Sequence, residues 1–170
     1  LSSKRAIPAM PVAGSYRCID FALSNMTNSG IGKVGVITQF NARSLNLYLM
    51  SSKWWNFGRK KGGLYLFTPT ITNGNHSWYR GTIDAILQNL NWLINCHEPY
   101  VIVAPGDGIY KLDYNELLDY HIQKNADVTI VCTHVDEDPS RFGLVKTDSD
   151  DRIVSFVEKP QNPDGNYVSC

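Results

Sequence analysis

The chain has 170 residues, 43% of them hydrophobic and 19% charged, which is the composition of a folded domain with a buried core. Its 16 Lys and Arg residues balance 16 Asp and Glu residues, so no broad basic surface is available for nucleic acid. No apolar run approaches the roughly 20 residues that a membrane-spanning helix needs, and no secretory signal pattern is present. We therefore expect a cytoplasmic protein that binds neither nucleic acid nor membranes.

The expected elements alternate between strands and helices along the chain. Residues 34–38, 100–104 and 128–132 are apolar runs rich in β-branched side chains, typical of strands in a parallel sheet covered on both faces. A helix is predicted from an N-cap at Thr82 to about residue 96, and another over residues 114–124. The apolar stripe of the first helix is expected to face the core and consists of Ile83, Ile86, Leu87, Leu90, Leu93 and Ile94. This alternation predicts a doubly wound, mostly parallel, Rossmann-like α/β fold in a single domain.

Two segments depart from this alternation. Residues 142–147 and 152–157 predict an antiparallel hairpin across an acidic turn. Residues 52–77 are the least regular part and contain the basic run 59–61 and a turn at Asn73–Gly74. A solvated surface excursion is the favoured interpretation of this part, and an effector-facing loop is the alternative.

Several common site motifs are missing from the sequence. The four cysteines are widely spaced without a Cys-x-x-Cys pair, which favours reduced thiols over a zinc or redox site. The four histidines show no metal-ligand spacing. Neither G-x-x-x-x-G-K-[ST] nor G-x-G-x-x-G occurs, which counts against P-loop and dinucleotide-binding proteins.

Asp107 stands between two glycines directly after the apolar run 100–104. Ligands of open parallel sheets bind beyond the carboxyl ends of the strands, and a carboxylate there is a suitable oxygen ligand for Mg²⁺. An Asp in a Pro-Gly-Asp-Gly sequence is equally typical of a tight turn, so spacing alone leaves the two interpretations even. Asp113, just before the next helix, is better explained as a cap.

A second candidate site surrounds the Gly81–Thr82 pair that opens the first helix. Helix starts offer unpaired backbone N–H groups and here also a hydroxyl, which suits an anion or a nucleobase. The rings of Trp78 and Tyr79 are candidates for stacking on a base, and Arg80 for pairing with a phosphate. Taken alone the signal is weak, because helix starts are common.

Charged pairs at the ends of two other segments are further candidates. Glu158 and Lys159 follow an apolar strand that Pro160 ends, and they suit sugar hydroxyls and a phosphate. An edge-strand salt bridge is the more common explanation for such a pair. Lys4 and Arg5 lie next to each other and are able to meet an anion.

These stretches, in this order, resemble the sugar-phosphate nucleotidyltransferases, and specifically bacterial glucose-1-phosphate adenylyltransferase (ADP-glucose pyrophosphorylase). The resemblance covers nearly the whole chain and is carried by KRAIPAMPVAGSYRCIDFALSNMTNSGI, VGVITQFNARSLN, WYRGTIDAILQNL, GDGIYKLDY, ADVTIVC and RFGLVKTDSDDRIVSFVEKP. It implies an enzyme that makes ADP-glucose and pyrophosphate from ATP and glucose 1-phosphate with Mg²⁺, in glycogen or starch synthesis.

The resemblance also implies roles for individual positions. Asp107 matches the catalytic, metal-binding acid. The positions matching nucleotide contacts are Tyr79, Gly81 and Thr82, and Gln39 matches a segment linked to nucleotide binding or activation. The positions matching sugar-phosphate contacts are Gly143, Glu158 and Lys159. Lys4 matches a basic position near the effector site.

Three positions depart from the pattern of the catalytic subunits. Ile7 replaces a Lys that acts on the phosphates, Gly108 replaces a His, and Ile83 replaces an Ala. An Ile carries no charge and donates no hydrogen bond. The changes at Ile7 and Gly108, with the stretches PVAGSYR and SSKWWNFGRKKGGLYLFTP, resemble the regulatory (GlgD-type) subunit. This resemblance implies a weakly active chain beside a catalytic sister subunit, in a hetero-tetramer.

The chain starts at Leu1, close to the first motif, so we expect a fragment of a longer protein. The resemblance implies a Gly-rich triphosphate loop before Leu1, and a second metal-binding Asp and a β-helix domain after Cys170. Two alternatives stay open at this point. One is a fully active nucleotidyltransferase for another sugar or nucleotide, and the other is a non-catalytic module that senses a sugar phosphate.

Overall fold

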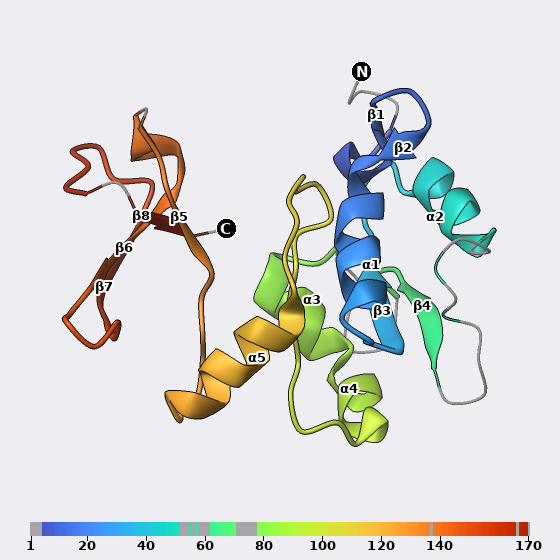
Figure 1. Ribbon diagram of the computed structural model, residues 1–170. Helices are drawn as coiled ribbons and strands as arrows, with labels where there is room; N and C mark the ends of the chain where they lie inside the picture. Colours follow the sequence, from blue (N-terminus) through green and yellow to red (C-terminus); the bar gives the residue numbers. More distant parts are fainter. Residues whose placement is uncertain are drawn as a thin grey trace. The chain divides into compact units, whose positions relative to one another are not determined.

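The computed structural model describes residues 5–51, 55, 57, 62–70, 78–136, 138–165 and 167–169 (Figure 1). The chain divides into two compact units, Leu1–Leu117 and Leu118–Cys170, each considered by itself. We call them the N-terminal and the C-terminal unit. Lys4, the basic run 59–61 and the Asn73–Gly74 turn lie outside the described residues.

The N-terminal unit contains short strands and several helices. In chain order these are η1 (Ile7–Ala9), β1 (Pro11–Val12), β2 (Tyr16–Arg17), α1 (Cys18–Asn28), β3 (Lys33–Ile37), α2 (Arg43–Met50), β4 (Gly63–Phe67), α3 (Thr82–Gln88), α4 (Leu90–Cys96) and the start of α5 (Tyr114–Gln123). Strands β1 and β2 pair antiparallel, and β3 and β4 pair parallel. The predicted strand at 34–38 and the helix at 114–124 are therefore confirmed within one residue at each end.

Strand β4 falls within the part of the sequence expected to be irregular. It runs parallel to β3, with Lys33 opposite Gly63 and Ile37 opposite Phe67. Gly62 and Gly63 indicate a loop in the sequence, but the close approach of the two strands requires a small residue here. A Cβ on Gly62 would lie 2.3 Å from the carbonyl oxygen of Gly32.

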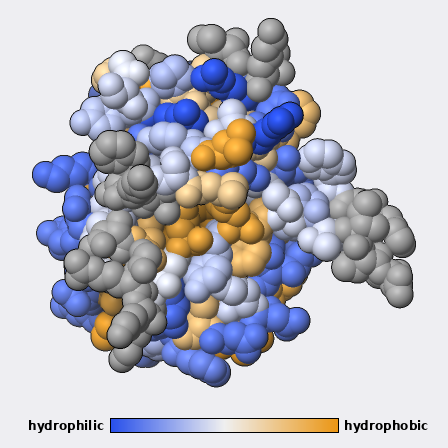
Figure 2. Space-filling model, turned by 90° about the vertical axis from the view of Figure 1, so that its right-hand side faces the viewer, coloured by the Kyte–Doolittle hydropathy of each residue, from blue (hydrophilic) through white to orange (hydrophobic). Residues whose placement is uncertain are grey.

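The core of the N-terminal unit lies between α1, α2 and β3 (Figure 1). Its buried members are Ala9, Ile19, Leu23, Val34, Leu45, Leu49, Trp55 and Phe57. Each large apolar side chain buried in this way contributes about 1.5–3 kcal/mol. Helix α2 buries Leu45 and Leu49 but exposes Leu47 and Met50, and Figure 2 views the side of α2 and β4, where apolar surface lies among polar side chains.

Helix α1 follows the N-cap residue Arg17, whose backbone N–H is bound by the side chain of Asp20. The backbone N–H of Arg17 donates to Oδ2 of Asp20 at 2.9 Å. Asp20 is the third helical residue, and its carboxylate reaches back to the residue before the first turn.

Two predictions for the parallel sheet are wrong in the described residues. Residues 100–104 form no strand, and Val101 and Val103 are 57% and 61% exposed. A strand needs ladder hydrogen bonds, and no described strand pairs with this run. The predicted strand at 128–132 is present only as β5 (Cys132–His134), which pairs antiparallel.

The predicted helix from Thr82 to about residue 96 is interrupted at Asn89. Gly81, rather than Thr82, occupies the N-cap position of α3. Trp92 of α4 packs on β3 at Gly35, where a Cβ would lie 2.9 Å from the indole ring. The stripe expected to face the core is instead solvent-exposed at Ile83, Leu87, Leu90 and Ile94.

The C-terminal unit is a four-stranded antiparallel sheet in the order β5-β8-β6-β7. Its strands besides β5 are β6 (Gly143–Thr147), β7 (Ile153–Glu158) and β8 (Tyr167–Ser169), and a short helix η2 (Pro139–Arg141) precedes β6. The predicted hairpin is confirmed as β6–β7. The fold is therefore mixed α/β, with a parallel pair in one unit and an antiparallel sheet in the other.

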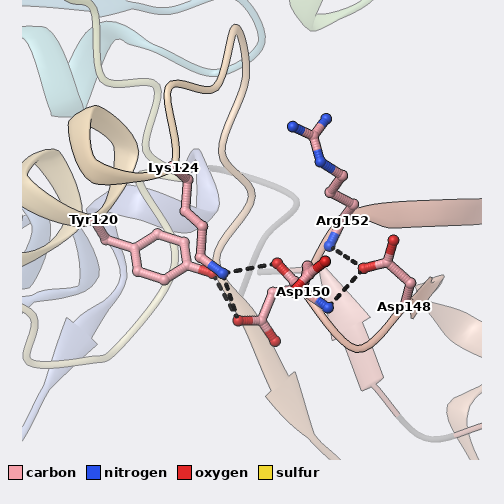
Figure 3. Close-up of polar contacts among 6 residues, drawn as sticks. Tyr120, Lys124, Asp148, Asp150 and Arg152 are labelled. Atoms are coloured by element: carbon pink, nitrogen blue, oxygen red, sulfur yellow. Dashed lines mark hydrogen bonds and ion pairs between the residues drawn. The ribbon is translucent and has the colours of Figure 1, made fainter.

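The acidic turn of this hairpin is ordered by its own carboxylates (Figure 3). Oδ1 of Asp148 accepts hydrogen bonds from the backbone N–H groups of Asp150 and Arg152, both at 2.9 Å. Lys124, the residue just after α5, donates to the carbonyl of Asp150 at 2.7 Å, and the hydroxyl of Tyr120 on α5 donates to Asp151 at 3.0 Å. These contacts attach the hairpin to the end of α5.

Candidate functional site

Gln39 lies just beyond the carboxyl end of β3 and holds the backbone of Tyr79. Its Oε1 accepts the Tyr79 N–H at 2.6 Å, and its Nε2 donates to the Tyr79 carbonyl at 3.3 Å. The preceding Thr38 is buried, and its N–H donates to the Phe67 carbonyl at the end of β4. The Trp78–Thr82 segment is thus attached to the edge of the parallel pair where α/β proteins bind ligands.

The two aromatic residues of this segment differ in accessibility. The Tyr79 side chain is buried, with 9% exposure, whereas Trp78 is 59% exposed. In addition, the Tyr79 hydroxyl accepts a hydrogen bond from Nδ2 of Asn89 at 3.2 Å. In this arrangement the ring that is accessible for stacking on a base is that of Trp78.

Arg80 and Asp84 form an ion pair at the start of α3. Oδ2 of Asp84 accepts the Arg80 N–H at 2.9 Å, and Oδ1 lies 3.1 Å from the guanidinium. The backbone bond and then the side-chain bond from Arg80 lower the pKa of Asp84, which keeps this carboxylate ionised. An anionic ligand at the helix start therefore competes with Asp84 for Arg80, whose side chain is otherwise 83% exposed.

A shallow surface depression of about 610 Å³ lies over this helix start. Its lining residues are Arg80, Gly81, Thr82, Ile83, Asp84 and Leu87. Gly81 has an extended backbone and no atom within 4 Å of the position of a Cβ, so the depression is open at that point. It presents a cation, a hydroxyl and apolar side chains together.

Asp107 lies in an exposed bend that packs against the N-terminal segment. A Cβ on Gly106 would lie 3.3 Å from Cγ of Pro8 and 3.8 Å from Ile19. The bend therefore lies beside η1, whose first residue, Ile7, is 53% exposed. Ile7, which stands where the resemblance implies a Lys, thus lies in the segment that contacts the Asp107 bend.

The donor set at Asp107 fits a magnesium ion held largely by a ligand. The described residues contain no group of three or more His, Cys, Asp or Glu side chains able to hold a metal by themselves. A single exposed carboxylate suits Mg²⁺, which is commonly bound by one or two carboxylates, waters and substrate phosphates.

The chain after Asp107 is anchored to α1. A Cβ on Gly108 would lie 2.8 Å from the ring of Tyr110. The backbone carbonyl of Tyr110 accepts a hydrogen bond from Nδ2 of Asn25 at 3.0 Å. The Tyr110 hydroxyl lies 2.8 Å from that of Tyr114, and burial followed by this bond raises the pKa of Tyr114. The Tyr110 ring therefore covers the position where the resemblance expects a His.

Asp113 caps α5, as the sequence predicts. Its Oδ1 accepts the backbone N–H of Asn115 at 2.9 Å and the hydroxyl of Ser29 at 3.1 Å. The backbone bond from Asn115 lowers the pKa of Asp113. With these bonds made, Asp113 has a structural role at the helix start.

In the C-terminal unit the proposed sugar-phosphate residues lie together. Gly143 pairs with Glu158 across β6 and β7, and Nζ of Lys159 lies 3.5 Å from the Glu158 carboxylate. Lys159 has φ +44°, which ends the strand alternation and brings the two adjacent side chains to one side. Both side chains are well exposed, so the pair contributes little stability and is open to a ligand.

The predicted site residues thus fall into groups. Gln39, Tyr79, Gly81 and Thr82 lie in one connected segment, and Gly143, Glu158 and Lys159 lie at one sheet edge of the other unit. Sequence reasoning missed Asn89 and the pairing of Asp84 with Arg80. The i, i+4 spacing of Arg80 and Asp84 was an available signal, whereas nothing local marks the contact of Asn89 with Tyr79.

Comparison with known proteins identifies the family. Residues 1–170 match the family described as Nucleotidyl transferase. The chain belongs to this family. It is also 43% identical to a protein named glucose-1-phosphate adenylyltransferase from Clostridium novyi (strain NT), over 99% of this chain and 44% of that protein. Proteins of the same name from Geobacillus stearothermophilus and Lachnospira eligens are 45% and 46% identical, over 99% of this chain and 44% and 40% of their lengths.

The chain thus spans less than half the length of these relatives. Within the described residues, no helix combines the length and the apolar character needed to cross a membrane. Reduced, buried thiols were expected; among Cys18, Cys96 and Cys132, Cys18 is buried, whereas Cys96 and Cys132 are only partly buried.

Proposed function

We propose that the full-length protein is a subunit of a glucose-1-phosphate adenylyltransferase in glycogen biosynthesis. The reaction converts ATP and glucose 1-phosphate to ADP-glucose and pyrophosphate. The observation that carries the proposal is the similarity of 43–46% identity over nearly the whole chain to relatives with this name. A cytoplasmic location stays a prediction.

The chemistry needs positioning and charge neutralisation rather than a covalent nucleophile. A phosphate oxygen of glucose 1-phosphate forms a bond to the α-phosphorus of ATP, and the bond from that phosphorus to pyrophosphate breaks. The Gln39-anchored segment Trp78–Thr82 binds the nucleotide, with Trp78 on the base and the helix start near the phosphates. Glu158 and Lys159 bind the sugar phosphate. Asp107 would hold Mg²⁺, which when bound would supply positive charge beside the transferring phosphate.

We further propose that this chain is the regulatory type of subunit, paired with a catalytic sister subunit in a hetero-tetramer. The supporting feature is Ile7, an exposed apolar side chain in the segment that packs against the Asp107 bend. Loss of one preorganised cation or donor at a transferring phosphate costs on the order of 10²–10³-fold in kcat. Binding of ATP needs fewer such contacts and is retained. Lys4 is proposed to belong to the effector site.

The test uses the full-length protein alone and mixed with a catalytic subunit from the same source. We expect ATP and Mg²⁺ binding by calorimetry, very slow ADP-glucose formation alone, and stimulation of the catalytic subunit in the mixture. Fast ADP-glucose formation by the protein alone contradicts the regulatory type. Fast turnover of another sugar phosphate or nucleotide in a substrate panel contradicts the adenylyltransferase, and glucose 1-phosphate binding without any nucleotide binding indicates a sensing module.

A further inference from the structure

Asn89 occupies the junction between α3 and α4, and the geometry there is unusual. Its backbone N–H donates to the carbonyl of Ile86 at 3.0 Å instead of to that of Ala85 four residues before. The Ala85 carbonyl would then lose its ordinary helical partner. Nδ2 of Asn89 takes over this role and donates to Ala85 at 2.8 Å.

The same side-chain nitrogen makes a second contact, to the hydroxyl of Tyr79 at 3.2 Å. An amide nitrogen carries two hydrogens, and Asn89 therefore uses one for Ala85 and one for Tyr79. The Tyr79 ring is buried, so its hydroxyl would have few alternative partners if Asn89 were absent. The helix interruption thus provides the donor that holds the far end of Tyr79.

Tyr79 is consequently held at both ends by side-chain amides. Gln39 pairs with its backbone N–H and carbonyl, and Asn89 donates to its hydroxyl. We propose that Asn89 is a positioning residue, which together with Gln39 fixes Tyr79 and thereby the conformation of the following Arg80–Thr82 segment. The effect on nucleotide binding rests on the proposed function, whereas the anchoring of Tyr79 does not.

If Asn89 served only to end α3, Tyr79→Phe would leave hydrogen exchange at residues 78–82 unchanged. Tyr79→Phe removes only the hydroxyl contact and leaves the Asn89–Ala85 bond intact. If Asn89 anchors Tyr79, Tyr79→Phe and Asn89→Ala should speed hydrogen exchange at residues 78–82 to a similar extent. The double variant should then exchange no faster than Asn89→Ala. Asn91→Ala is the matched control, because Asn91 is an exposed Asn on α4 two residues away.

The experiment measures two quantities in the full-length protein and these variants. Hydrogen exchange, followed by mass spectrometry, reports on peptides covering residues 78–82, and calorimetry reports Kd for ATP with Mg²⁺ and for glucose 1-phosphate. Loss of one neutral hydrogen bond predicts exchange about three- to ten-fold faster and ATP binding weaker by a similar factor. Glucose 1-phosphate affinity and the Asn91→Ala protein stay unchanged.

Unchanged exchange at residues 78–82 in Tyr79→Phe overturns the anchoring, even if Asn89→Ala fails to fold. Strictly additive effects in the double variant also overturn it, since the two residues then act independently. Faster exchange with unchanged ATP affinity overturns the positioning role. A wild-type protein that binds no ATP overturns the proposed function instead, and the exchange rates still decide whether Asn89 holds Tyr79.

Discussion

The hydroxyl of Tyr48 on α2 donates a 2.8 Å hydrogen bond to Oδ2 of Asp20 on α1. Asp20 is buried, and its other oxygen, Oδ1, has no partner among the described residues. The guanidinium of Arg17 lies 3.8 Å over the Tyr48 ring and donates to the Ser44 carbonyl. A buried acid, a phenol and a cation thus connect the two helices that enclose the core.

Tyr48→Phe is expected to lower the free energy of unfolding by about 2 kcal/mol, the scale of a hydrogen bond to a charged group. Asp20 would retain only the Arg17 N–H as its partner. Urea denaturation of the full-length protein measures the change. Tyr16→Phe serves as the control because Tyr16 is exposed and should leave stability unchanged. Equal stabilities of wild type and Tyr48→Phe would show that the bond contributes nothing.

The same residue predicts a loss of stability at alkaline pH. Burial, and then the bond to Asp20, raise the pKa of Tyr48 from 10.0 to about 12. The unfolded chain therefore loses this proton at lower pH than the folded chain. The contribution of Tyr48 is complete below pH 10.0 and is lost as the pH rises through about 12. Denaturation at pH 9 to 12 should show a steeper decline for wild type than for Tyr48→Phe; parallel declines would refute this.

Gly143→Ala is expected to destabilise the C-terminal sheet by about 1–3 kcal/mol through overpacking. The new Cβ would lie 2.6 Å from Cζ of Phe156 and 2.9 Å from Oγ of Ser169. Phe156→Leu in the same chain should recover part of the loss because it removes the clashing ring edge. Gly32→Ala, where nothing lies within 4 Å of the added atom, is the matched control. A Gly143→Ala protein as stable as wild type would contradict the contact.

Asp107→Asn should weaken Mg²⁺-dependent ATP binding about ten-fold or more without changing stability. The reason is that Asn carries no charge, whereas Mg²⁺ prefers carboxylate oxygens. Calorimetric titration of ATP with and without Mg²⁺ measures the effect. Asp119→Asn removes an exposed acid from α5 and is expected to leave ATP binding unchanged. An unaltered dependence on Mg²⁺ in Asp107→Asn would reject Asp107 as a metal ligand.

Elements with local causes were predictable from the sequence. The β6–β7 hairpin follows from alternating apolar residues around a turn, and α5 from its own periodicity and the cap at Asp113. Strand β4 was missed because its partner β3 lies 30 residues earlier, and parallel pairing leaves no local signal. The antiparallel direction of β5 likewise depends on β8, which is distant in the sequence.

The candidate site was predicted as a set of positions rather than as an arrangement. The motifs indicated Gln39 and Tyr79 separately, but their mutual hydrogen bonds span 40 residues. The interruption at Asn89 escaped prediction because an Asn in a helical pattern is ordinary, and its use depends on the Tyr79 hydroxyl. Burial of Tyr79 and exposure of Trp78 are also tertiary properties that neighbouring residues in the sequence do not reveal.

The most direct test of the central claim is the rate of ADP-glucose formation by full-length Ile7→Lys, measured alone with ATP, glucose 1-phosphate and Mg²⁺. Ile7→Leu, which keeps an apolar side chain at the exposed position, is the control. If Ile7 limits turnover, the Lys variant should be faster than wild type by about 10²–10³-fold, the scale of one preorganised cation or donor. The Leu variant should match wild type. Rapid turnover by wild type that Ile7→Lys leaves unchanged would contradict the assignment of this chain as a regulatory subunit.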